Sequence, residues 1–452
     1  MGNRAAIILA AGQGTRMRSS LPKVLHKVGG RAMVDWSIGL AKSVGCETII
    51  VVCSPNGVAV QEHVTSVLGA DAIAIQDPPL GTGHAVLAAK EALAGFQGEL
   101  VVLYGDTPLI PADAINALFK EIDEGAAVGV LGFDAAEPGA YGRLVADENG
   151  NLQQIVEAKE ASPAQLEISF CNSGVMAAPA PVMFDLLSKV TNDNAKNEYY
   201  LTDIVGLARA TGKSCRAVSC DEADVLGVNS RVELAQAEQA FQTKKRAQFL
   251  AAGVTMTAPE TVFFSHDTQI ENDVVLEPGV VFSTGVSVKS GAEVRAFSHL
   301  EGASVAEDCV IGPYVRLRPG TVLERGVKIG NFVEIKKTRM GAGAKASHLS
   351  YLGDGDVGAE ANIGAGTIFC NYDGFLKYQT TVGDGAFVGS NSSLVAPVTI
   401  GAGAFVGSGS VITKDVEPDG LAVARGRQIQ KSGWATSFRD KMAAIKAAKK
   451  KG

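Results

Sequence analysis

The chain has 452 residues, of which 46% are hydrophobic and 20% are charged. A chain of this length and composition can form the buried cores of two or three domains. Its formal net charge is −7 and its isoelectric point is near 5.5. This acidic balance argues against a nucleic acid as the main partner, because neutralising a phosphate polymer requires a basic surface.

The cysteines and the N-terminal segment indicate a cytoplasmic protein. Seven cysteines are odd in number, are scattered and lack CxxC spacing, so we expect neither a disulfide framework nor a zinc site. The apolar run that opens the chain, AAIILAAG, is too short for a signal sequence or a membrane span. We therefore expect no membrane insertion, and we expect the Lys-rich C-terminal end to be a solvated tail.

Residues 1–229 alternate between predicted strands and helices. AAIILA is followed by a helical stretch near 33–44, the strand TIIVV, a helix near 58–68 and, further on, the strand ELVVLY. This alternation predicts a Rossmann-like α/β domain, with a mostly parallel sheet covered by helices on both faces. Ligands of such sheets bind at the carboxyl ends of the strands.

A glycine-rich loop, LAAGQGTRM (9–17), follows the first predicted strand, and LPK (21–23) comes shortly after. Its glycines let backbone N–H groups approach phosphate oxygens closely, while Arg16 and Lys23 add positive charge. It is not a P-loop, because GK[ST] is missing, and not a dinucleotide fingerprint, because Met17 stands where the third glycine would be. Taken alone, a GxG sequence is more often a simple tight turn.

Residues 230–252 predict a helix that connects two domains. The stretch from 230 to 250 lacks Gly and Pro, and Ser230 with Glu233 three residues later has the spacing of a capping box.

Residues 253–452 contain an apolar position that recurs every six residues, often with glycine directly after it. A period of six fits neither an α-helix nor a heptad, but it suits three short strands per coil of a parallel β-solenoid. The recurring positions fall into three registers: Ile270, Leu276, Phe282, Val288, Val294 and Leu300; Ile311, Leu317, Leu323, Ile329 and Ile335; Val382, Val388, Leu394, Ile400, Val406 and Ile412.

The repeat breaks at 336–352 and at 369–380. Repeat folds are stable without an active site, so the solenoid on its own could be only a scaffold. Insertions in solenoids form loops that often bind ligands, and we therefore expect the reactive side chains at these two breaks.

Several motifs together resemble the sugar-1-phosphate nucleotidyltransferases: GxGTRM…PK, Gln76 with GTGHA (81–85), YGDTPL (104–109), YGR (141–143), IVEAK (155–159), NSG (172–174) and GVNS (227–230). Further motifs extend the resemblance over essentially the whole chain, to the bacterial bifunctional N-acetylglucosamine-1-phosphate uridyltransferase/glucosamine-1-phosphate acetyltransferase family: RLRPG (316–320), NFVEIKK (331–337), ASHLSYLGD (346–354), NIGAGT (362–367) and NYDG (371–374). One departure is Ala140 before YGR. The resemblance implies a left-handed parallel β-helix of hexapeptide repeats.

For the first domain, the resemblance implies a uridyltransferase site in which Gln76 and Thr82 face the uracil. Gly142, Glu157 and Asn172 would bind the amino sugar, and Asp106 and Asn229 would hold Mg²⁺, which prefers hard oxygen donors. Without the surrounding motifs, Asp106 would be interpreted as a residue that caps a turn at the end of a strand, and Asn229 as a residue that caps a helix. The remaining nucleotide-binding positions are Leu9, Ala10, Ala11, Gly12, Gly14, Thr15, Arg16, Lys23, Gly81, Tyr104 and Gly105.

The reaction so implied is in-line attack of a sugar-1-phosphate oxygen on the α-phosphorus of UTP, with release of pyrophosphate. The nucleophile is already anionic, so no general base is needed. The metal, Arg16, Lys23 and backbone amides would position the phosphates and neutralise the developing charge.

For the solenoid, the resemblance implies acetyl transfer from acetyl-CoA to glucosamine-1-phosphate. The attacking amine must lose a proton, and a neutral imidazole is the natural base near physiological pH. An isolated histidine in a loop is commonly structural, but the ASHLSYLGD context selects His348. The histidines at 26, 63, 84, 266 and 299 receive no role in proton transfer.

The other acetyltransferase positions follow from the same resemblance. Arg318 and Lys336 would bind the sugar phosphate, which requires cations. Glu334, Tyr351 and Asn362 would surround the amino sugar, with Glu334 or Asn371 orienting it. The acetyl-CoA positions are Ala365, Asn371, Tyr372, Ser390, Ser408 and Arg425.

The sequence therefore predicts a two-site cytoplasmic enzyme of cell-envelope precursor synthesis, which makes N-acetylglucosamine-1-phosphate and couples it to UTP. The resemblance implies a homotrimer formed through the β-helix, with each acetyltransferase site shared between subunits. One alternative is a single-activity nucleotidyltransferase with a regulatory or oligomerising solenoid. A non-enzymatic scaffold ranks last, because Lys23, Asp106 and the GxGTRM loop are all present.

Overall fold

The computed structural model describes residues 3–148, 151–194 and 196–449. The chain divides into two compact units. The first comprises Met1–Ala251 and Phe263–His266, and the second comprises Ala252–Val262 and Asp267–Gly452.

The first unit is built on a twisted sheet with the strand order β11-β7-β10-β6-β1-β4-β5. β10 is antiparallel to both of its neighbours, whereas every other neighbouring pair on this path is parallel, so the predicted mostly parallel sheet is confirmed. The strands of this unit are β1 (Arg4–Leu9), β2 (Lys27–Val28), β3 (Arg31–Ala32), β4 (Cys46–Cys53), β5 (Ile73–Ile75), β6 (Glu99–Tyr104), β7 (Val128–Asp134), β8 (Arg143–Ala146), β9 (Leu152–Val156), β10 (Phe170–Pro179) and β11 (Cys215–Cys220).

Helices cover both faces of this sheet, as predicted. In β1, Ala6 and Ile8 point into one core cluster and Ala5 and Ile7 into the other, as the alternation of a strand requires. The first cluster is closed by α1 (Met33–Ser43), α2 (Val58–Leu68) and α4 (Ala112–Asp123), and the second by α3 (Thr82–Ala88), α6 (Ala180–Leu187) and α7 (Asp203–Ala210). A short helix, α5 (Pro163–Leu166), follows β9.

The predicted connecting helix exists as α8 (Arg231–Ala251), but it belongs to the first unit. Its Ala237 and Phe241 are buried in a cluster with Met17 and other residues of the N-terminal segment. At its start, the Ser230 hydroxyl accepts a hydrogen bond from the Glu233 N–H, while the Glu233 carboxylate accepts from Asn229, one residue earlier than in a regular capping box.

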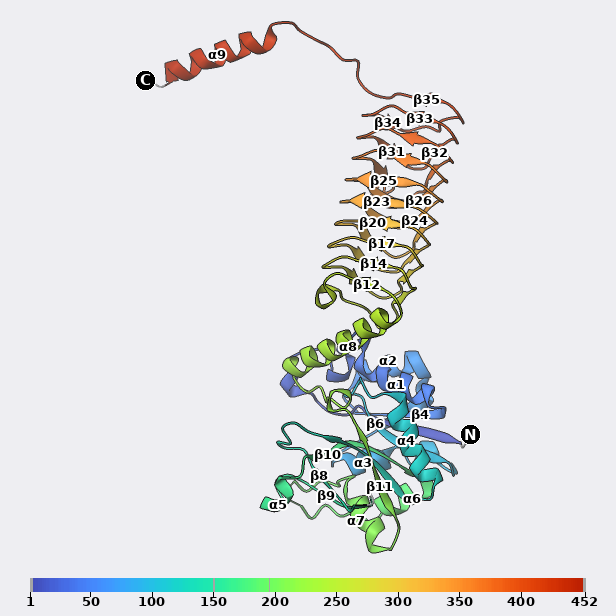
Figure 1. Ribbon diagram of the computed structural model, residues 1–452, viewed down its shortest axis with the longest axis vertical. Helices are drawn as coiled ribbons and strands as arrows, with labels where there is room; N and C mark the ends of the chain where they lie inside the picture. Colours follow the sequence, from blue (N-terminus) through green and yellow to red (C-terminus); the bar gives the residue numbers. More distant parts are fainter. Residues whose placement is uncertain (1–2, 149–150, 195, 450–452) are drawn as a thin grey trace. The chain divides into compact units, whose positions relative to one another are not determined.

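The second unit is the predicted parallel β-helix, seen in Figure 1 as a stack of short strands. Every aliphatic or aromatic position of the three registers is buried, and Ile270 pairs with Val288, three hexapeptides further on. The strands are β12 (Thr255–Met256), β13 (Gln269–Ile270), β14 (Val275–Leu276), β15 (Val281–Phe282), β16 (Ser287–Val288), β17 (Glu293–Val294), β18 (His299–Leu300), β19 (Ala303–Val305), β20 (Val310–Ile311), β21 (Arg316–Leu317), β22 (Thr321–Leu323), β23 (Lys328–Asn331), β24 (Glu334–Met340), β25 (Lys345–His348), β26 (Tyr351–Val357), β27 (Asn362–Ile363), β28 (Ile368–Cys370), β29 (Thr380–Val382), β30 (Phe387–Val388), β31 (Ser393–Val395), β32 (Val398–Ile400), β33 (Phe405–Val406), β34 (Val411–Ile412) and β35 (Leu421–Ala422).

The glycines of the repeat are explained by the close approach of adjacent coils. A Cβ placed on Gly330 would lie 1.9 Å from the carbonyl oxygen of Ser347, and one on Gly364 would lie 2.5 Å from that of Val388. Because non-bonded atoms do not approach so closely, a side chain at either position would force the coils apart.

The two breaks in the repeat differ in kind. At 336–352 the expectation of an inserted loop is wrong: Ile335 pairs with Leu352, one residue short of three hexapeptides, and β24 and β26 run on as long strands. At 369–380 the insertion is real, because Val357 pairs with Val382, seven residues beyond three hexapeptides.

The last element of the described residues is α9 (Trp434–Lys449), which has no buried residue. None of the helices in the described residues combines the length and the apolar character that a membrane span requires.

Candidate active sites

A pocket of about 380 Å³ opens in the first unit where β1 and β6 end, which is the predicted edge of the sheet. Ten of its lining residues were predicted from the sequence: Leu9, Ala10, Ala11, Gly12, Lys23, Gln76, Gly81, Thr82, Tyr104 and Asp106. Gln13 lies within the predicted loop 9–17, and four lining residues were not predicted: Val24, Pro79, Ala85 and Glu198. Thr15 and Arg16 are exposed and are not among the lining residues.

The glycine-rich loop is held at both ends. Gly14 has a φ of +61°, and a Cβ there would lie 2.6 Å from the Cβ of Lys23, so only glycine fits. Met17, which replaces the third glycine of a dinucleotide fingerprint, is buried in the cluster beneath α8 and anchors the loop. A Cβ on Gly12 would meet nothing within 4 Å, so its backbone is open to a ligand.

Lys23 joins the two predicted magnesium ligands. Its Nζ lies 2.5 Å from Asp106 Oδ2 and 3.0 Å from Asn229 Oδ1. The Lys23 and Asp106 side chains are only 10% and 16% exposed. Asn229 is positioned by its own N–H, which donates to the Glu233 carboxylate at 2.7 Å. The structure thus brings three predicted residues together around one positive charge.

This pair of oxygens fits a magnesium ion. The Asp106 carboxylate oxygen and the Asn229 amide oxygen converge on the position of the Lys23 ammonium group, so they can face a cation. Mg²⁺ commonly takes one or two oxygens from protein and completes its octahedron with phosphates and water. Among the described residues there is no group of three or more His, Cys, Asp or Glu side chains that could hold a metal ion.

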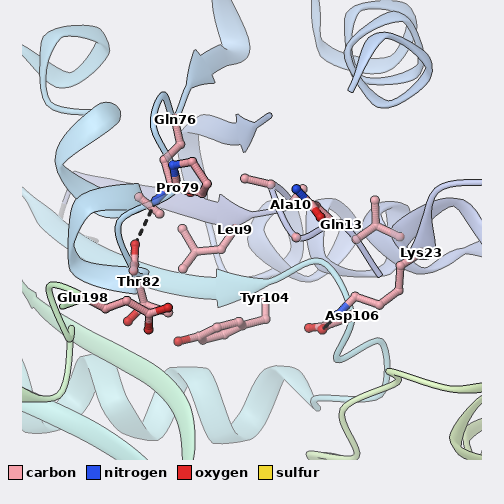
Figure 2. Close-up of a pocket in the computed structure, with 15 residues that line it drawn as sticks. Leu9, Ala10, Gln13, Lys23, Gln76, Pro79, Thr82, Tyr104, Asp106 and Glu198 are labelled. Atoms are coloured by element: carbon pink, nitrogen blue, oxygen red, sulfur yellow. Dashed lines mark hydrogen bonds and ion pairs between the residues drawn. The ribbon is translucent and has the colours of Figure 1, made fainter. Parts of the chain in front are cut away.

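The opposite end of the pocket is built from Gln76, Thr82 and Glu198, as Figure 2 shows. Gln76 is 6% exposed and donates from Nε2 to the carbonyl oxygen of Gly81 at 2.9 Å. Thr82 Oγ1 accepts from the Leu201 N–H at 3.1 Å. Polar groups fixed in this way can recognise a flat, hydrogen-bonding ring.

The predicted amino-sugar residues lie together beside Tyr104. The Asn172 N–H donates to the carbonyl oxygen of Gly142 at 2.8 Å, and a Cβ on Gly142 would lie 3.6 Å from Glu157 Oε1. Burial raises the pKa of Glu157. Burial, followed by the charges of Asp106 and Glu157, raises the pKa of Tyr104, which keeps its hydroxyl protonated as a donor.

The loop that contains Ala140 is held by hydrogen bonds from Arg143. The buried Arg143 guanidinium donates to the carbonyl oxygens of Pro138, Gly139 and Tyr141 and so ties the loop to β8.

On the second unit, His348 lies in a column of residues on successive coils. Asn331 and His348 are register partners, and the backbone at His348 bonds to the next coil at Gly366, directly after Ala365. The column continues through backbone bonds between Ala365 and Asn391 and between Ser390 and Gly409, and through the Arg425 guanidinium, which donates to the Ser408 carbonyl oxygen at 2.7 Å. The predicted acetyl-CoA positions Ala365, Ser390, Ser408 and Arg425 therefore form one line that leads to His348.

The His348 ring is oriented by Asn331, a residue that sequence reasoning did not single out. Its Nδ1 lies 2.6 Å from Asn331 Oδ1, and an amide oxygen can only accept a hydrogen bond. In the neutral ring whose Nδ1–H donates to this oxygen, the lone pair of Nε2 is free to take a proton from a substrate amine. Asn331 belongs to the motif NFVEIKK and lies one coil of the β-helix before His348, and this spacing is the feature of the sequence that could have identified it.

A second group of polar residues gathers around Lys336. The nearby Lys377 ammonium, followed by burial, lowers the pKa of Lys336, and Arg318 acts in the same direction. Arg318 also donates to Glu334 at 2.8 Å, and Asn371 donates to Asp354 at 2.5 Å. Adjacent cations of this kind favour an anion between them. Lys377 and Asp354 were not singled out from the sequence: the inserted loop carries Lys377 back to Lys336, whereas Asp354 lies in the motif ASHLSYLGD (346–354).

One predicted residue, Asn362, lies on a different sheet from this group, and another, Tyr372, lies opposite Lys377 on the inserted loop. Asn362 is on β27, in the ten-stranded sheet, whereas Glu334 and Tyr351 are register partners in the fourteen-stranded one. Tyr372 is 58% exposed on the inserted loop, where its hydroxyl donates to the Gly374 carbonyl oxygen at 2.5 Å.

Comparison with known proteins gives a consistent result. Residues 6–165 match the family described as MobA-like NTP transferase domain, and residues 302–337 and 379–414 match the bacterial transferase hexapeptide repeats. The chain is 63% identical over 446 residues to a protein of Hyphomonas neptunium named Bifunctional protein GlmU, covering 99% of this chain and 97% of that one. Proteins with the same name from Caulobacter vibrioides and Ruegeria sp. are 58% and 52% identical, each over 99% of this chain and 96% and 99% of their own lengths.

Proposed function

Because the chain belongs to the family of bifunctional GlmU proteins, it is an enzyme with two transferase activities, and we propose which residues carry each of them. One activity transfers an acetyl group from acetyl-CoA to glucosamine-1-phosphate. The other transfers uridylyl from UTP to N-acetylglucosamine-1-phosphate, which gives UDP-N-acetylglucosamine and pyrophosphate. The alternative of a single activity with a regulatory solenoid is set aside, since the likeness to bifunctional relatives covers 99% of the chain.

Uridylyl transfer is assigned to the pocket of the first unit. Gln76 and Thr82 at one end would hold the uracil, and the open backbone at Gly12 would receive the phosphates together with Lys23. Gly142, Glu157 and Asn172 beside Tyr104 would orient the sugar so that its anionic phosphate oxygen faces the α-phosphorus. No residue need take a proton in this step.

Asp106 and Asn229 are the residues that would hold Mg²⁺, whose charge, when it is bound, offsets the negative charge that accumulates on the phosphates. Lys23 supplies a positive charge for the same phosphates.

Acetyl transfer is assigned to the column on the second unit, and the observation that carries it is the contact between His348 and Asn331. Nε2 of His348 would accept the proton of the sugar amine as the amine attacks the thioester carbonyl, and the CoA thiolate would leave. The column from Ala365 to Arg425 would bind acetyl-CoA, while Arg318, Lys336 and Lys377 would hold the sugar phosphate.

We also propose that three chains associate through their β-helices and share the acetyltransferase sites. Asn362 lies on a different sheet from Glu334 and Tyr351, which fits a sugar site completed by a second chain. The hexapeptide repeat is consistent with oligomerisation. Sedimentation equilibrium at the mass of three chains would agree with this arrangement.

The cytoplasm is the compartment we propose, since all seven cysteines are free thiols and would persist as such in a reducing environment. The product, a nucleotide-activated amino sugar, suits the synthesis of cell-envelope precursors.

Two single substitutions test the division of labour. Asp106→Ala should abolish uridylyl transfer and leave acetyl transfer at the wild-type rate, and His348→Ala should do the reverse. Each variant is the folding control for the other, because each keeps one activity. Loss of both activities in either variant, with an unchanged melting temperature, would show that the two sites are not separate.

A further inference from the structure

The Lys23 side chain lies where a metal ion would have to bind. Its ammonium contacts Asp106 Oδ2 at 2.5 Å and Asn229 Oδ1 at 3.0 Å, and these are the two oxygens assigned to magnesium. A divalent cation that used both oxygens would be next to the ammonium, and two positive charges at such a distance repel each other strongly in a partly buried site.

Each of the three groups is held in place by its surroundings. The aliphatic stem of Lys23 packs on Gly14, where even one added carbon would be 2.6 Å away. Asn229 is fixed by Glu233, and the backbone of Asp106 accepts from the Val228 N–H at 2.9 Å. The contact is therefore a built feature of the site and not one orientation of a freely moving surface lysine.

We propose that Lys23 acts as a tethered cation that closes the metal position in the nucleotide-free enzyme, and that the phosphates of the nucleotide release it. This inference rests on the proposed uridyltransferase site. An ammonium has three donors on a flexible stem and can exchange carboxylate and amide oxygens for phosphate oxygens. Lys23 lines the nucleotide pocket, so phosphates bound there are within its reach.

The consequence is coupled binding of metal and nucleotide. When phosphates draw Lys23 away, Asp106 and Asn229 become available to the metal, so nucleotide raises the affinity for the metal. By thermodynamic linkage the metal must raise the affinity for nucleotide by the same factor. Lys23 thus positions the metal ligands in addition to contacting phosphate, and it keeps the metal from binding alone.

The test is the affinity for Mn²⁺, used as a paramagnetic probe and measured on the full chain by the loss of the free-ion resonance signal. Lys23→Met keeps the stem against Gly14 and removes the charge. Without nucleotide, this variant should bind Mn²⁺ about tenfold or more tightly than the wild type, because hydrogen bonds to charged groups have at least that effect on an equilibrium. With saturating UTP the advantage should disappear. Lys23→Gln should behave as Lys23→Met does.

Two further variants make the result interpretable. Lys27→Met removes an exposed lysine from the neighbouring strand and should leave Mn²⁺ affinity unchanged, which controls for net charge. Asp106→Asn should weaken Mn²⁺ binding. Equal affinity of Lys23→Met, Lys23→Gln and wild type, with weaker binding by Asp106→Asn, would overturn the tethered cation and leave the proposed function standing. Unchanged binding by Asp106→Asn would overturn both. The melting temperature of each preparation reports that the first unit is folded.

Discussion

Removal of the Asn331 side chain should slow acetyl transfer by a modest and calculable factor. The His348 ring contacts Asn331 Oδ1, which lies 2.6 Å from Nδ1. A neutral hydrogen bond contributes about 1 kcal/mol, which corresponds to about a fivefold preference for the tautomer with a free Nε2. Asn331→Ala should therefore lower kcat by about fivefold to tenfold, whereas His348→Ala should lower it by about a hundredfold or more.

The assay is release of free CoA that depends on glucosamine-1-phosphate, corrected for the seven thiols of the chain. In Asn331→Ala, KM for acetyl-CoA and the rate of uridylyl transfer should stay at their wild-type values. Asn331→Asp keeps an oxygen that accepts from Nδ1 and should retain most of the activity. Adding Asn331→Ala to His348→Ala should have no further effect, because the two residues act as a unit.

Three results would refute this reasoning. A fully active Asn331→Ala variant would show that the ring does not need its partner. A rise in KM without a fall in kcat would make Asn331 a substrate contact. A further loss in the double variant would show that Asn331 acts independently of His348.

Two other substitutions test packing and pH dependence. Gly330→Ala would place its Cβ 1.9 Å from the Ser347 carbonyl oxygen and should lower the free energy of unfolding by on the order of 3 kcal/mol, which would appear as a lower Tm. As a control, the Cβ in Gly12→Ala meets nothing within 4 Å, so this variant should melt like the wild type. Equal Tm values for the two variants would contradict the close approach of the coils. Burial raises the pKa of Glu157, so this carboxyl contributes stability below its unfolded pKa and loses that contribution as pH rises through its folded pKa. The Glu157→Gln variant should therefore have the Tm of the wild type near pH 4 and a higher Tm than the wild type near pH 8. A Tm difference that does not change with pH would contradict this.

Much of the fold could be predicted from the period of the sequence. The six-residue spacing identified the buried positions of the β-helix because each repeat makes the same turn. The alternation of strands and helices identified the sheet and both of its covering layers for a similar reason. The antiparallel β10 was not visible in this way, since a strand has the same residue pattern in either direction.

The parts of the sites that escaped prediction depend on contacts between distant residues. Glu198 reaches the pocket because the backbone at Tyr199 bonds to Leu80 and Gly83, which no local pattern encodes. Lys377 reaches Lys336 only because the inserted loop folds back. The shortened coil at 336–352 looked like an insertion, because losing one residue disturbs a six-residue period as much as gaining several.

One chain performs both transfers, acetyl transfer first and uridylyl transfer second. The most direct measurement is mass spectrometry of the nucleotide product formed from glucosamine-1-phosphate, UTP and acetyl-CoA labelled in its acetyl group. We expect UDP-N-acetylglucosamine that carries the label, with one CoA and one pyrophosphate released per molecule. Formation of UDP-glucosamine without the label, or no nucleotide sugar at all from folded protein, would contradict it.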